Sequence, residues 1–227
     1  MYTPRMISEE QISNSMMQAG ELAELMSRNG GKVLDHVDKD EVKHYAWLRE
    51  HLHDSSLKDN EEFKENFSNT YRLSGRRVSL TWKERLFELM ERSKESESFD
   101  FFETFHLLYK ETSTTKLGPT QFSILSKVAS TLDDQFPVFE TNVGDLLGFK
   151  KPTSTKDTSH ERMREYMNFY EHTKTVYSDL AENPKVLDLL KVFKIQHREH
   201  IGFLPVAKRL DFLVRSAANL KSKGSMV

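Results

Sequence analysis

Cysteine is absent from this 227-residue chain, and no apolar run approaches the roughly 18 residues that a membrane-spanning helix requires. The absence of cysteine excludes disulfides, thiolate nucleophiles, iron–sulfur clusters and cysteine-based zinc sites. The start of the chain, Met1 to Arg5, is not followed by the apolar segment of a signal peptide. We therefore expect an intracellular, cytoplasmic protein that does not insert into a membrane.

Strand-like patterns are also missing, because no segment alternates apolar and polar residues over a sustained run. Helical spacing recurs instead, and the 15 Phe, 7 Tyr and 2 Trp offer core side chains where aliphatic residues are few. These patterns predict an all-α fold. The expected helices cover residues 8–26, 40–53, 59–71, 81–90, 99–111, 125–132, 141–147, 162–180, 186–197 and 206–220.

The net charge of −2 conceals an uneven distribution along the chain. Residues 1–66 carry 8 Lys/Arg against 14 Asp/Glu, whereas residues 185–227 carry 9 against 3. The basic C-terminal part is suited to binding an anion or nucleic acid, although a solvated helix face has the same composition. We predict an acidic helical region over residues 1–58, a helical domain over residues 59–220 and a flexible tail over residues 221–227.

The segment from Gln121 to Gly148 carries the most informative pattern. Apolar residues recur there at helical spacing from Leu125 to Leu132, and Lys127 points away from that stripe. Glu140 follows an apolar, proline-bounded loop and precedes a second helix. Taken alone, Lys127 is a solvated lysine and Glu140 is a carboxylate that favours a helix N-terminus.

The same segment resembles the active-site region of helix-hairpin-helix DNA glycosylases, nearest the 8-oxoguanine glycosylase branch. Those enzymes carry Thr-Lys-Val-Ala at a helix start, followed by Pro-Val-Asp after a spacer. This chain has Ser126-Lys127-Val128-Ala129 and then Pro137-Val138-Phe139-Glu140. A looser group of small relatives is similar in having a Tyr-Arg pair before a Trp-containing helix and a late Lys-x-h-Asp-Phe helix, here at 71–72, 82 and 208–212.

Two departures from the family pattern stand out. The family hairpin reads Pro-Gly-h-Gly, whereas residues 122–125 contain no glycine to bring the backbone close to a DNA phosphate. The hydroxyls of Ser123 and Ser126 would then replace part of that grip. The family aspartate is replaced by Glu140, 13 residues after the lysine.

The resemblance implies a two-lobed helical domain with a divergent helix-hairpin-helix and a central cleft. It also implies excision of a modified or damaged base from duplex DNA, in repair or in defence against modified foreign DNA, with or without lyase activity. Lys127 would attack the sugar, favoured by a helix N-terminus nearby, and Glu140 would stabilise the sugar's developing charge. The implied base-pocket residues are Tyr71, Trp82 and Phe102, and the implied DNA contacts are Arg72, Arg76, Arg77, Ser123, Ser126, Asn142, Lys208 and Arg209.

Other interpretations remain open at this point. A non-catalytic helical module could bind DNA or a protein partner on the same scaffold, and each arginine could be an ordinary surface charge. His51, His53, His197 and His200 are interpreted as surface residues because their spacing makes poor metal sites. No metal or cofactor is expected, and the sequence does not define an oligomeric state.

Overall fold

A computed structural model describes residues 9–73, 79–94, 100–112, 119–149 and 159–226 of the protein. Within these ranges the chain is all-α, with eleven α-helices and no strand. The helices are α1 (Glu9–Arg28), α2 (Gly30–Asp35), α3 (Lys39–Glu50), α4 (Glu61–Thr70), α5 (Leu80–Lys94), α6 (Phe101–Thr112), α7 (Pro119–Leu132), α8 (Thr141–Leu146), α9 (Ser159–Glu182), α10 (Pro184–Gln196) and α11 (Val206–Ser222), with a 3₁₀ helix, η2 (Ile201–Phe203), before the last. The predicted all-α class is confirmed.

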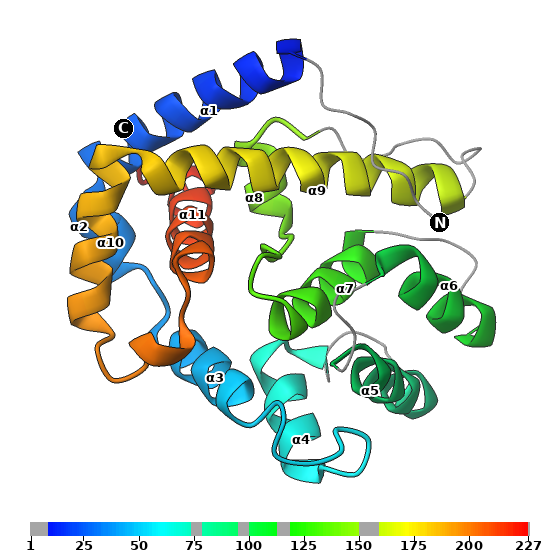
Figure 1. The fold of residues 1–227 in the computed structure, drawn as a ribbon. Coiled ribbons are helices and arrows are strands. Elements are labelled where there is room, and N and C mark those ends of the chain that lie inside the picture. Colours follow the sequence, from blue (N-terminus) through cyan, green and yellow to red (C-terminus); the bar gives the residue numbers. More distant parts are fainter. Residues whose placement is uncertain (1–8, 74–78, 95–99, 113–118, 150–158, 227) are drawn as a thin grey trace.

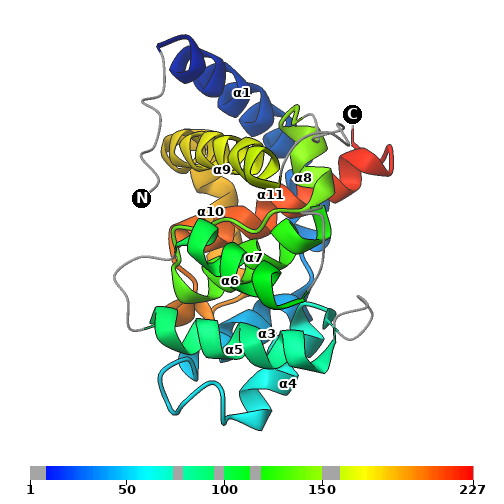
Figure 2. The same cartoon turned by 90° about the vertical axis from the view of Figure 1, so that its right-hand side faces the viewer.

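Two helices, α7 and α11, occupy the interior of the fold. α7 contacts α3, α5 and α6, whereas α11 contacts α2, α8, α9 and α10. In both views, α1 and α9 lie at one end, α4 and α5 lie at the other, and α7 and α11 lie between them (Figures 1 and 2). Helices from the N-terminal and C-terminal parts of the sequence contact each other, because α1 packs along α9 and α2 packs on α11.

The helix α7 differs from its predicted form in two ways. It is one continuous helix from Pro119 to Leu132, so residues 122–125 are helical and form no hairpin. The prediction placed a hairpin there by analogy, but these residues contain no glycine and are all suited to a helix interior. In addition, residues 122–131 are all buried, so α7 has no solvated face on which Lys127 could lie.

A second feature of the fold concerns the Asn29-Gly30-Gly31 segment, whose composition is typical of a turn. It starts α2 directly after α1, with Asn29 at the N-cap position. A Cβ atom on Gly30 would lie 2.9 Å from Leu189 Cδ2, so this glycine allows α2 to approach α10 closely. The sequence indicates a glycine with a flexible backbone. In the folded protein, the lack of a side chain at Gly30 matters because it makes room for Leu189.

Two of the histidines also differ from prediction. His197 is buried, with its ring 4.4 Å from that of Phe193, and burial lowers the pKa of its imidazole. His51 is half-buried and stacks on Trp47 at a ring-centroid distance of 4.2 Å. Both are packing residues at helix ends rather than surface residues.

Aromatic rings from four segments form the core beside α7. Phe122 on α7 is fully buried and contacts the rings of Phe101, Phe139, Tyr166 and Tyr170 at centroid distances of 4.6–5.9 Å. Phe63 and Phe67 on α4 and Tyr71 at its C-cap are buried along one face, as their spacing predicts. No helix in the described part of the chain is both long and apolar enough to cross a membrane.

The aromatic core generates a stability prediction. Replacing Phe122 with alanine should lower the free energy of unfolding by about 3–5 kcal/mol, because the cavity cannot close against rigid rings. Replacing the exposed Leu80 with alanine should cost less than about 0.5 kcal/mol. Urea denaturation followed by circular dichroism measures both, and similar losses for the two variants would contradict the assignment of Phe122 to the core.

Candidate functional site

The loop that carries Glu140 is held by hydrogen bonds to three consecutive residues. Tyr170 Oη donates to the Pro137 carbonyl at 2.7 Å, the Val138 N–H donates to Asp211 Oδ1 at 3.1 Å, and the Phe139 N–H donates to Ser126 Oγ at 2.9 Å. Three backbone groups of this extended segment therefore have hydrogen-bond partners outside it. Glu140 follows directly and occupies the N-cap position of α8, where its side chain makes no capping hydrogen bond.

The bond between Ser126 and Phe139 joins the two predicted catalytic segments. Ser126 is fully buried, and its hydroxyl also donates to the Ser123 carbonyl at 2.9 Å. Lys127 immediately follows Ser126, and Glu140 immediately follows Phe139. One hydrogen bond thus fixes the backbone of the lysine relative to the backbone of the glutamate.

Asp211 on α11 is a buried carboxylate that contacts both this loop and two cationic side chains of its own helix. Its Oδ1 accepts from Val138 N–H and from Tyr177 Oη at 3.4 Å, and its Oδ2 lies 3.0 Å from Lys208 Nζ and 3.5 Å from Arg215 Nε. Asp211 is completely buried, and Lys208 is 2% exposed. Two cations and two neutral donors together compensate for the loss of its hydration.

Lys208 belongs to this buried network. Its ammonium donates to Ser130 Oγ and to Asp211, and it lies 4.4 Å from the centre of the Tyr45 ring. Burial lowers the pKa of Lys208, although the charge of Asp211 acts in the opposite direction. The predicted role of Lys208 as a phosphate contact does not fit this position, since its amine has no access to a ligand outside the fold.

Arg215 lies one helical turn after Asp211 and connects this buried carboxylate with Glu140. Its Nη1 lies 2.5 Å from Glu41 Oε1 and 3.3 Å from Glu140 Oε1, and the residue is only 5% exposed. Burial by itself lowers the pKa of the guanidinium, but the surrounding carboxylates of Glu41, Asp211 and Glu140 raise it well above its usual range. Arg215 is therefore a permanent positive charge beneath Glu140.

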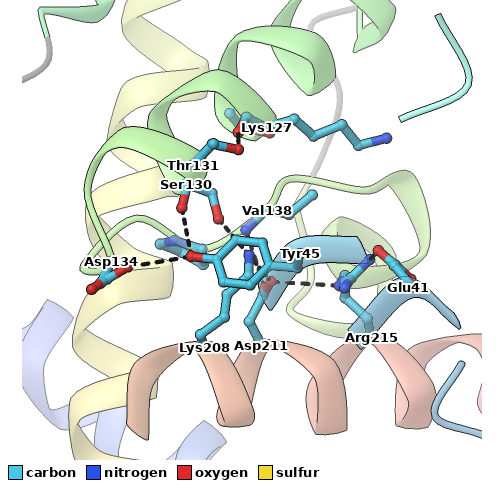
Figure 3. A network of polar contacts seen from close by, with 12 residues as sticks. Glu41, Tyr45, Lys127, Ser130, Thr131, Asp134, Val138, Lys208, Asp211 and Arg215 are labelled. Atoms are coloured by element: carbon cyan, nitrogen blue, oxygen red, sulfur yellow. Dashed lines mark hydrogen bonds and ion pairs between the residues drawn. The ribbon is translucent and has the colours of Figure 1, made fainter. Parts of the chain in front are cut away.

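A cavity of about 670 Å³ opens above this arginine and brings both predicted catalytic residues together. Lys127 and Glu140 both line it, and the Lys127 amine lies 5.5 Å from the centre of the Tyr71 ring. Figure 3 shows the Lys127 side chain extending away from Lys208, toward the side where Glu41 and Arg215 lie. The other lining residues are His36, Val37, Asp38, Asp40, Glu41, His44, Asn69, Thr70, Tyr71, Arg72, Phe212, Arg215, Ser216, Asn219 and Lys223.

Two other predicted site residues, Tyr71 and Arg72, also line the cavity. Tyr71 is buried against α7, where its hydroxyl lies 3.0 Å from Thr131 Oγ1, and burial raises its pKa. Arg72 is exposed at the rim, and its φ of 52° places it in the left-handed region. Non-glycine residues rarely adopt this conformation, so the surrounding structure determines the direction of Arg72.

The remaining predicted site residues are distributed differently. Asn142 lies near the cavity, where its Nδ2 donates to the lining residue Asn219 at 2.7 Å. Trp82 is half-buried on α5 and does not line the cavity, and Arg209 Nε donates to the Leu204 carbonyl. Ser123 and Ser126 are both buried, and neither lines the cavity. Arg76, Arg77 and the Phe102 side chain lie outside the described residues.

The predicted mechanism also placed Lys127 near a helix N-terminus, and this is wrong. Lys127 lies more than two turns into α7, which begins at Pro119. The field of a helix terminus falls off within the first turn, so it does not act on this amine. What surrounds the Lys127 amine is the interior of the fold: the residue is 6% exposed and its side chain lies over the ring of Tyr71.

Sequence reasoning missed Glu41, His44 and Arg215, all of which line the cavity. Glu41 and His44 lie in the acidic N-terminal region, which no motif connects with residues 127–140. Arg215 carries a weak signal, because Lys208, Asp211 and Arg215 recur at i, i+3 and i+7 on one helix face. Among the described residues, no group of three or more His, Asp or Glu side chains is placed to hold a metal ion.

Comparison of the chain with protein families, with curated proteins and with solved structures found no match. The interpretation of the site therefore depends on its own geometry and chemistry.

The Asp211 network generates a second prediction. Asp211→Asn keeps the shape of the side chain but leaves Lys208 and Arg215 without a buried counter-charge, so unfolding free energy should fall by about 3–5 kcal/mol. The matched control is Asp188→Asn on α10, because Asp188 forms an exposed pair with Lys191 at the same i, i+3 spacing. That variant should lose less than about 1 kcal/mol in the same urea titration. Equal losses would contradict the central role of Asp211.

Proposed function

We propose that this protein is a DNA glycosylase that excises a modified or damaged base by cleaving its N-glycosidic bond. The observation that carries this proposal is that Lys127 and Glu140 line one cavity and are tied together by the Ser126–Phe139 hydrogen bond. An amine and a carboxylate facing one space are the two groups required by a glycosylase that attacks the sugar with a lysine. The cavity takes the place of the central cleft that the resemblance implies.

The volume and the aromatic walls of the cavity support binding of an extruded nucleotide. Its volume of about 670 Å³ lies within the range of ordinary small-molecule sites. A base that leaves the duplex stack is usually held against aromatic side chains, and the buried ring of Tyr71 forms one wall beside Lys127. Phe212 supplies a second aromatic lining residue from α11.

The reaction assigns separate roles to the two residues. The neutral Lys127 Nζ would form a bond to C1′ of the deoxyribose as the bond from C1′ to the base breaks, and the departing base would take the bonding electrons and the proton that the attacking amine loses. Nucleophilic lysine amines are commonly desolvated, which agrees with the 6% exposure of Lys127. Glu140, placed over Arg215, would stabilise the positive charge that develops on the sugar.

DNA would approach from the basic side of the cavity rim. Arg72 and Lys223 line the cavity and are exposed, so they are the available phosphate contacts. Asp38 and Asp40 on the α3 side would repel the phosphate backbone.

The proposed chemistry is tested with duplexes that carry a panel of modified bases. Wild-type protein should release a base from at least one of them, and borohydride should trap a covalent protein–DNA product through the Schiff base. Lys127→Met should abolish trapping, and Glu140→Gln should slow base release by about 10²-fold or more because the sugar cation loses its counter-charge. Release is measured by alkaline strand cleavage and trapping by gel shift.

Exposed Lys194 on α10 offers the matched control, because Lys194→Ala removes an amine that does not line the cavity. It should leave release and trapping unchanged. Thermal melting of each variant separates loss of chemistry from loss of fold. No release from any duplex, or release that survives both cavity substitutions, would refute the proposal.

A non-catalytic helical module that binds DNA or a protein is the second candidate. The observation that favours it is the engagement of Glu140 by Arg215, since a carboxylate in an ion pair can be purely structural. Such a module would bind DNA with an affinity that falls as salt rises, or bind no DNA at all, and would yield no base product.

Arg72 distinguishes DNA binding from protein binding. Arg72→Gly removes the guanidinium, and glycine fits the left-handed backbone, so the variant should keep its stability. Its affinity for duplex DNA should fall, and the slope of log Kd against log salt concentration should decrease by about 1. Arg164→Ala removes an exposed charge from α9 and should leave affinity unchanged. Fluorescence anisotropy between about 50 and about 200 mM salt measures both. An unchanged slope in Arg72→Gly would exclude Arg72 as a phosphate contact.

A further inference from the structure

Most of the carboxylates that line the cavity are engaged within the protein. Glu41 and Glu140 both pair with Arg215. Asp38 accepts hydrogen bonds from the Asp40 and Glu41 N–H groups at the start of α3. Asp40 is exposed and is the remaining carboxylate of the lining. The negative charge that the cavity offers to a ligand is therefore smaller than its composition indicates.

Two cations of the lining are available to a ligand. Arg72 and Lys223 are exposed, and neither side chain forms a hydrogen bond or an ion pair with another residue in the part of the chain that the structure describes. With Asp40 as the only carboxylate set against them, the available charge of the described lining is positive. A positively charged cavity favours an anionic ligand.

The wall formed by α11 and its C-cap residue presents different chemistry at successive turns. Four lining residues recur at i, i+3, i+7 and i+11 and so share one helix face: Phe212, Arg215, Asn219 and Lys223. At 1.5 Å per residue, this face extends about 16 Å from the aromatic residue to the lysine. Glu140 contacts Arg215, which lies between these two ends. The order along the wall is aromatic ring, carboxylate, amide and ammonium group.

A nucleotide carries matching groups in the same order. Its base packs against aromatic rings, its sugar carries the carbon whose developing charge a carboxylate stabilises, and its phosphate binds to cations. Tyr71 adds a second aromatic ring to the lining, beside Lys127. Arg72 directly follows Tyr71 and so belongs to the base end, which leaves Lys223 as the cation for the phosphate.

The backbone of Lys223 is fixed by a capped helix end. Gly224 adopts a left-handed φ of 65°, and the Ser225 N–H donates to the Leu220 carbonyl at 2.9 Å, which satisfies one of the last acceptors of α11. Lys32 Nζ on α2 donates to the Ser225 carbonyl at 3.2 Å. Lys223 is therefore presented to the cavity from an anchored segment.

We propose that the cavity binds a free nucleoside monophosphate, with its base beside Tyr71 and its phosphate on Lys223. The orientation of the ligand rests on the proposed function, which places the sugar at Glu140, whereas binding itself requires neither DNA nor catalysis. The protein would thus recognise the nucleotide unit alone, phosphate included, without the rest of a duplex.

Isothermal titration calorimetry with the common 2′-deoxynucleoside 5′-monophosphates tests this site. The corresponding nucleosides and inorganic phosphate serve as partial ligands. At least one nucleotide should bind, and it should bind more tightly than its nucleoside or inorganic phosphate. Lys223→Ala should weaken nucleotide binding by about tenfold, because a charge-assisted hydrogen bond to the phosphate is lost, and should leave nucleoside binding unchanged.

Lys221→Ala is the matched control, because Lys221 is exposed in the last turn of α11 and does not line the cavity. It should bind the nucleotide as the wild-type protein does. Lys223→Arg keeps the positive charge and should restore most of the affinity. Both lysines are exposed, so thermal melting should be the same for all three variants.

Equal nucleotide affinity in Lys223→Ala and Lys221→Ala would overturn the inference. Nucleotide binding no tighter than that of inorganic phosphate would also overturn it, as would the absence of binding to every nucleotide at millimolar concentration. Nucleotide binding by a protein that releases no base from any duplex would refute the proposed function and retain this site. Base release without nucleotide binding would have the opposite meaning.

Discussion

The structure depends on the compensation of one buried carboxylate. Asp211 has no exposure to solvent, and it is stabilised by Lys208, Arg215, the Val138 N–H and the Tyr177 hydroxyl. A buried charge is tolerated only when its partners replace its hydration, so these groups must meet at one point. Because they come from α9, α11 and the loop before α8, the requirement also determines how those segments are arranged.

The candidate site is an extension of that network toward solvent. Arg215 contacts Asp211 on its buried side and Glu41 and Glu140 on its cavity side. The Ser126–Phe139 hydrogen bond adds the second constraint, which places Lys127 at the same cavity. Rigid positioning of this kind is what a lysine nucleophile and its carboxylate partner require. A purely structural network would show the same contacts. An assay of base release therefore has to distinguish the glycosylase from the non-catalytic module.

Local patterns predicted most of the helices and several core positions, because helical spacing of apolar residues is a local property. Phe63, Phe67 and Tyr71 are buried as their spacing indicates. The pattern failed at α7, where Lys127 was expected on a solvated face, because a helix surrounded by others has no such face. It failed again at residues 122–125, where a hairpin was expected by analogy and a continuous helix occurs.

The sequence by itself determined the all-α class, most helix positions and the presence of a lysine and a glutamate in a motif-like order, since these follow from spacing and composition. Only the tertiary structure decided that Lys127 and Glu140 share a cavity with Glu41 and Arg215. It also decided that Lys208 is a buried partner of Asp211 rather than a surface charge. Contacts between residues separated by more than 170 positions, such as Glu41 and Arg215, leave no local signal in the chain.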